Sequence, residues 1–123
     1  MLAENKDNLL IKNKKQVLDK EIEQKRILNN LETIDTCLLQ LGKLNAEREH
    51  LFEEEYQYVS GGRYQQKFEQ KTSHYNEVVT SLKKKLNQSV EELEENHLAL
   101  TKEIQLLETE NDQIRREMTE THD

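Results

Sequence analysis

The stretch that decides the fold is VEELEENHLALTKEIQLLETENDQI, residues 90–114. Its apolar residues recur at alternating steps of three and four, with Val90 and Ile104 at the a position of a heptad repeat. The d positions fall at Leu93, Leu100, Leu107 and Ile114. A repeat sustained over several heptads is typical of a helix that packs along another helix. The sequence therefore predicts a coiled coil, with a heptad zipper over residues 86–118.

The composition favours the same fold class. Of the 123 residues, 33% are hydrophobic and 35% are charged, and the chain has no proline. A compact globular domain usually contains about 45–50% apolar residues. A narrow seam between helices needs only about two apolar residues in seven. Glu, Lys, Leu and Gln are abundant, and all are good helix formers. We therefore expect an all-α protein.

One segment interrupts the helical pattern at the middle of the chain. Ser60 is followed by Gly61 and Gly62, and each glycine costs about 1 kcal/mol inside a helix relative to alanine. The sequence thus predicts one unit, residues 1–123, with two helices of about 55 residues, over residues 4–58 and 64–120. A turn over residues 59–63 joins them at Gly61-Gly62.

The first arm carries a heptad of its own. Leu31 and Leu38 fall at a, and Ile27 and Ile34 fall at d. Before the zipper, the series through Tyr75, Val79 and Leu82 reaches Leu86 in the same steps, and the next step of four predicts a phase slip at residues 86–90. The predicted seam comprises Leu10, Val17, Ile27, Leu31, Ile34, Leu38, Leu41, Val79, Leu86, Val90, Leu93, His97, Leu100, Ile104, Leu107, Asn111, Ile114 and Met118.

The relative register of the two heptads favours a long antiparallel helical hairpin. In an antiparallel pair each a position faces a d position, and such pairs share a midpoint at Gly62. Asn13 then faces Asn111, and a buried asparagine pair penalises slipped registers. The alternative is a parallel coiled-coil dimer, because Asn at a beside Leu at d is also typical of parallel zippers.

The first arm has more apolar residues than one seam uses. A second stripe at the g positions comprises Cys37, Leu44, Leu51 and Tyr58. Surplus apolar groups on a helix suit a partner that lays a helix against it. The predicted partner-binding residues are Leu18, Leu39, Leu44, Leu51 and Tyr58.

Other function classes find little support. The net charge of −7 argues against nucleic acid, and no two histidines have zinc-ligand spacing. Two polar helices offer no catalytic pocket, and the apolar runs are too short to cross a membrane. We expect no enzymatic activity, no catalytic, metal or cofactor site, no small-molecule substrate and no membrane span. We also expect an intracellular location, in the cytoplasm or nucleus.

Aromatic residues cluster around the central glycines, in YQYVSGGRYQQKF at residues 56–68. The chain length, the paired arms and this segment resemble prefoldin subunits, which implies a chaperone subunit with a small β-hairpin between its helices. The residues themselves favour a structural coiled-coil subunit that assembles proteins into a larger complex. Such complexes include cytoskeletal, centrosomal or ciliary, kinetochore, chromosome-axis and tethering assemblies. The expected partners are other coiled-coil proteins, or the chain itself as a homo-oligomer.

Overall fold

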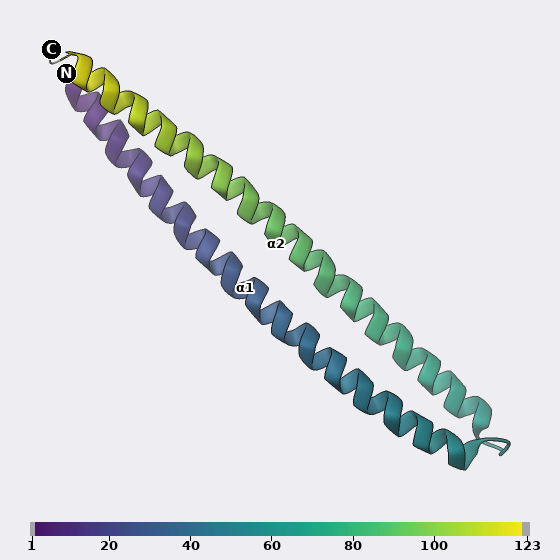
Figure 1. Ribbon diagram of the computed structural model, residues 1–123. Coiled ribbons are helices and arrows are strands. Elements are labelled where there is room, and N and C mark those ends of the chain that lie inside the picture. The colour runs from purple at the N-terminus through teal and green to yellow at the C-terminus, as the bar shows by residue number, and fades with distance from the viewer. Residues whose placement is uncertain (1, 122–123) are drawn as a thin grey trace. The chain divides into compact units, whose positions relative to one another are not determined.

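The computed structural model describes the backbone of residues 2–121 and the side chains of residues 4–120. It contains two long helices, α1 (Leu2–Val59) and α2 (Gln65–Thr121), which pack against each other as a helical hairpin (Figure 1). No strand occurs within residues 2–121. The predicted helical hairpin is therefore confirmed, since the chain reverses between α1 and α2 and does not continue through the glycines as one helix.

The reversal between the helices depends on one backbone conformation. Gly61 has a φ of 74°, in the left-handed region that side chains disfavour. The Gly62 amide donates to the Val59 carbonyl at 3.0 Å, and the Gly61 amide donates to the Gln65 side-chain oxygen at 2.7 Å. The first bond satisfies the Val59 carbonyl at the end of α1, and the second ties the connection to the side chain of the first residue of α2.

The small β-hairpin implied by the resemblance to prefoldin subunits is wrong for this chain. Within residues 56–68, α1 continues to Val59 and α2 begins at Gln65. The start of α2 is rich in Gln and Lys, which favour helix over strand. Only residues 60–64 remain to form the connection.

The packing divides into two units, which we describe separately. The first unit combines the described residues up to Asn30 with those from Glu92 onward. Its buried apolar side chains are Ile27, Ile104 and Ile114. Among the other predicted seam residues of this unit, Asn111 is buried. The rest are half-buried, namely Leu10, Val17, Leu93, His97, Leu100, Leu107 and Met118.

A buried pair of asparagines fixes the register of the first unit. Asn13 and Asn111 are only 3% and 4% exposed. Asn13 Nδ2 donates to Asn111 Oδ1 at 2.9 Å, as the alignment of the two heptads predicted. Asn111 Nδ2 donates in turn to the Leu10 carbonyl at 3.5 Å. A slipped register would leave these amides buried without partners, which is costly.

Two further polar contacts join the helices within this unit. Gln24 Nε2 donates to Thr101 Oγ1 at 2.8 Å, and Lys20 Nζ lies 2.8 Å from a Glu103 carboxylate oxygen. The ion pair is partly exposed, so it adds little stability. Lys20 and Glu103 face each other in only one register of the two helices, so the ion pair favours that register.

The second unit contains Leu31–Glu91. Val79 and Phe52 are its buried apolar residues. The predicted seam residues Leu31, Ile34, Leu38, Leu41, Leu86 and Val90 are half-buried. In both units the seam is therefore a thin strip, flanked by exposed side chains.

Leu82 was predicted to belong to the apolar series that leads to Leu86, and this prediction is wrong. Leu82 is 43% exposed, whereas Lys83 is half-buried. The residues Val79, Lys83, Leu86 and Val90 follow steps of four, three and four, so the heptad of the zipper extends back through Lys83. The aliphatic stem of a lysine can cover apolar surface while its ammonium group reaches water. The change of phase lies between Tyr75 and Lys83 rather than at residues 86–90.

The asparagine pair provides a test of register. Replacing Asn13 alone with leucine should lower the free energy of unfolding by about 1–3 kcal/mol, because Asn111 then keeps a buried amide without its partner. Replacing both with leucine should restore or raise the stability. Urea unfolding followed by circular dichroism measures both values. Equal destabilisation in the single and double variants would contradict a directly coupled pair.

Two glycines provide a matched test of the turn. A Cβ added at Gly61 or at Gly42 would meet no atom within 4 Å, so the two positions differ in backbone conformation and not in space. Gly61→Ala should destabilise the protein by about 1–2 kcal/mol, since alanine disfavours a positive φ. Gly42→Ala, within α1, should stabilise it by about 0.5–1 kcal/mol. Thermal unfolding should show shifts of opposite sign, and a shared sign would contradict the assigned turn.

Candidate functional site

The second unit exposes a row of apolar side chains along α1. Leu44 and Leu51 are 59% and 55% exposed, and Tyr58 is 89% exposed. Cys37 precedes them by one heptad and is also exposed. Residues spaced by seven lie on the same side of a helix. We call Cys37, Leu44, Leu51 and Tyr58 the g stripe.

The other two predicted partner-binding residues lie elsewhere. Leu39 is exposed in the second unit, but at a b position and so on a different side of α1 from the g stripe. Leu18 is exposed and belongs to the first unit. The structure therefore groups Leu44, Leu51 and Tyr58, and does not group Leu18 or Leu39 with them.

The first unit exposes a different apolar row, which includes the predicted partner-binding residue Leu18. Ile11, Leu18 and Ile22 are 66%, 59% and 60% exposed. Each residue turns the helix by about 100°, so these three lie within a narrow sector of α1. Four exposed basic residues lie within about 60° of the same sector. They are Lys14, Lys15, Lys25 and Arg26. We call these seven residues the basic stripe.

Near the turn, aromatic rings replace the aliphatic seam. The Phe52 ring contacts Phe68 and Tyr75 edge to face, with centroids 5.8 and 5.6 Å apart. The Arg48 guanidinium lies 4.5 Å from the centre of the Tyr75 ring, which is a cation–π contact. Tyr56 packs beside Phe68 at 6.2 Å. This cluster holds the two helices together just before the chain reverses.

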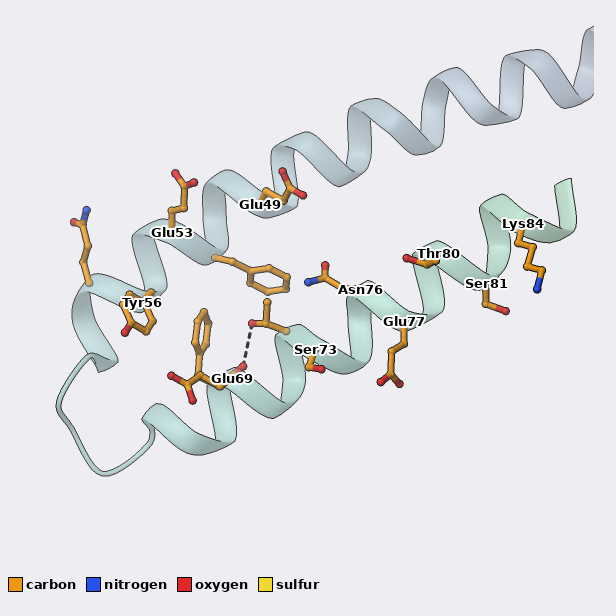
Figure 2. Close-up of a pocket in the computed structure, with 14 residues that line it drawn as sticks. Glu49, Glu53, Tyr56, Glu69, Ser73, Asn76, Glu77, Thr80, Ser81 and Lys84 are labelled. Atoms are coloured by element: carbon orange, nitrogen blue, oxygen red, sulfur yellow. Dashed lines mark hydrogen bonds between the residues drawn. The ribbon is translucent and has the colours of Figure 1, made fainter. Parts of the chain in front are cut away.

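Beside the aromatic cluster lies a groove of about 1210 Å³ between α1 and α2 of the second unit (Figure 2). Phe52, Tyr56 and Phe68 contribute its apolar surface. Its remaining lining is polar or charged and consists of Glu49, Glu53, Gln57, Glu69, Thr72, Ser73, Asn76, Glu77, Thr80, Ser81 and Lys84. We call it the acidic groove, because four carboxylates and one ammonium group line it.

The four carboxylates lack cationic partners. Asn45 Nδ2 donates to Glu49 at 3.5 Å, and Gln65 Nε2 donates to Glu69 at 3.0 Å. Among residues 4–120, no salt bridge involves any of the four carboxylates, Glu53 and Glu77 included. Figure 2 shows Glu49 and Glu53 on α1 and Glu69 and Glu77 on α2, so both walls of the groove are acidic. Like charges around an apolar surface favour a cationic, amphipathic ligand.

Metal-binding clusters and membrane-spanning stretches are absent from the described residues. No three His, Cys, Asp or Glu side chains within them could hold a metal ion together. The acidic groove has no histidine or cysteine in its lining. Neither helix, over its described length, has a stretch with the apolar character of a membrane span.

Comparisons with protein-family models, with curated protein sequences and with solved structures found no match to this chain. Its exposed surfaces therefore carry the functional argument.

Sequence reasoning missed the acidic groove for a definable reason. The heptad pattern indicated which residues approach the other helix, but not where the helices leave space between them. A usable signal was present, since Glu49 precedes Phe52 by three positions and Glu53 precedes Tyr56 by three positions, which is helical spacing. The matching residues of α2 become recognisable only when the hairpin register is known.

The aromatic cluster provides a stability test. Phe52→Ala should lower the free energy of unfolding by about 3 kcal/mol, because it removes a buried ring shared by two others. Arg48→Ala should cost about 0.5–1 kcal/mol, the size of an exposed cation–π contact. Leu39→Ala, at an exposed position, is the control and should change stability by less than about 0.5 kcal/mol. A Phe52 effect no larger than that of Leu39 would contradict the role of the cluster.

Proposed function

We propose that this protein is a non-enzymatic coiled-coil subunit that binds other helical proteins and so assembles a larger complex. The observation that carries the proposal is the exposure of the g stripe. Leu44, Leu51 and Tyr58 are large apolar residues, in register along one side of α1, and more than half of each remains in contact with solvent. A row of this kind favours a partner helix, because helix association removes apolar surface from water.

In the proposed mechanism, the paired helices provide a rigid support and the g stripe provides the binding surface. The helical geometry of α1 keeps the exposed side chains of the g stripe at fixed spacings, and the hairpin seam and the asparagine pair hold α2 against α1 in a single register. A partner helix with apolar residues at i, i+3, i+4 and i+7 would cover the g stripe. Because the stripe is pre-formed, little ordering entropy opposes binding. Cytoskeletal, centrosomal or ciliary, kinetochore, chromosome-axis and tethering complexes all use subunits of this kind.

The test is to place charge on the stripe without disturbing the helix. Leu44→Glu with Leu51→Glu should abolish partner binding, since burying two unpaired carboxylates against an apolar surface is unfavourable. Glutamate is a good helix former, so circular dichroism should show unchanged helicity. Binding is measured by crosslinking in the native cell followed by mass spectrometry of the recovered neighbours.

A matched control uses exposed leucines of α2. Leu98 and Leu106 are 55% and 71% exposed and lie outside the g stripe. Leu98→Glu with Leu106→Glu adds the same charge and removes the same side chains, and it should leave the crosslinked neighbours unchanged. Neighbours that persist in the Leu44/Leu51 variant, or are lost equally in both variants, would contradict the proposal.

A further inference from the structure

We propose that the acidic groove of one copy of this chain receives the basic stripe of a second copy. This inference rests on the proposed function in treating the hairpin as a binder of helices, and it deepens it by naming a partner. It uses none of the residues of the g stripe. Each chain carries both surfaces, so each copy can act as donor and as acceptor.

The acceptor surface combines two properties that a bound helix would satisfy together. Its aromatic residues Phe52, Tyr56 and Phe68 provide apolar contact area. The carboxylates on both walls have no cationic partner among residues 4–120. A helix that brings apolar side chains to the rings would cover their exposed surface. The ammonium or guanidinium groups of the same helix would pair with the carboxylates of both walls.

The donor surface has the complementary composition. Ile11, Leu18 and Ile22 form its apolar centre, and basic residues lie on either side of it. By helical angle, Lys14 and Lys25 fall on one side, and Lys15 and Arg26 fall on the other. Arg26 has an exposed contact with Glu23 at 3.2 Å, which is weak and can exchange for another carboxylate. The stripe therefore offers two cations to each wall of a groove that presents two carboxylates on each.

The lengths of the two surfaces are compatible on the α2 side. At about 1.5 Å per residue, the basic stripe extends over roughly 22 Å from Ile11 to Arg26. The groove lining on α2, from Phe68 to Lys84, extends over roughly 24 Å, and the lining on α1, from Glu49 to Gln57, over roughly 12 Å. Leu18 and Ile22, one helical turn apart, can then meet the aromatic rings, whose neighbouring centroids lie 5.8 and 6.2 Å apart, while the charges pair along the walls. This agreement in charge and apolar content favours a second copy over an unrelated basic helix.

The experiment measures the mass of the full-length chain by sedimentation equilibrium from about 1 μM to about 1 mM, the range of weak association. The ionic strength is held at about 0.15 M. The wild-type mass should rise with concentration above the 14.7 kDa of one chain. The groove variant, Glu53→Lys with Glu77→Lys, should associate at least tenfold more weakly. The stripe variant, Lys15→Glu with Lys25→Glu, should do the same.

Mixing the two variants is the decisive step. In an equimolar mixture the unaltered groove of one variant meets the unaltered stripe of the other, so association should return. Control pairs carry the same charge changes at exposed positions outside both surfaces: Glu47→Lys with Glu91→Lys, and Lys43→Glu with Lys71→Glu. Both controls should associate like the wild type. Circular dichroism verifies that every variant keeps its helicity.

Three results would overturn the inference: a wild-type mass that stays at one chain throughout, equal loss in the surface and control variants, or no recovery on mixing. A monomeric wild type whose groove binds a foreign basic helix would assign the groove to another partner and also overturns it. The Leu44→Glu, Leu51→Glu variant separates this proposal from the previous one. If this variant still self-associates and its crosslinked neighbours are unchanged, the proposed role of the g stripe is contradicted and the self-association is not. Lost neighbours with a monomeric wild type would contradict only the self-association.

Discussion

A pair of helices can bury only one strip of each helix, and this geometric limit determines the character of the whole protein. No side chain among those described is fully buried. Even the best-covered residues, such as Ile27 and Asn13, lie beside exposed neighbours. The chain therefore cannot hide all of its leucines, isoleucines and aromatic rings. Those that remain outside the seam gather in rows that a further helix can cover.

The polar groups within the seam specify the arrangement more than they stabilise it. A strip of leucines and isoleucines tolerates sliding by one heptad, because each apolar side chain finds a similar neighbour. The Asn13–Asn111 hydrogen bond and the contact of Gln24 with Thr101 do not tolerate it. Each would lose its partner in a shifted register. Fixed register is what keeps the facing residues of the two helices paired.

The fold was predictable because its determinants are periodic and local. The double glycine and the two heptads led to the antiparallel hairpin, and their common midpoint identified the facing asparagines. Hydrophobicity did not predict that Lys83, and not Leu82, lies in the seam. A lysine can pack its aliphatic stem into a seam while its ammonium group reaches water. The acidic groove was not predicted either. It combines residues of two helices at a place where aromatic rings hold the helices together, and a linear pattern does not record the space between them.

The positions of the aromatic cluster and the asparagine pair imply an order of folding. Phe68 follows Phe52 by only 16 residues, whereas the asparagines are separated by 98. Closing the longer loop first would cost about 1.6 kcal/mol more in chain entropy. The rings beside the turn can therefore meet early, and the helices then pair progressively away from it. The asparagine pair then forms late, so it acts as a check on a register already set near Gly61.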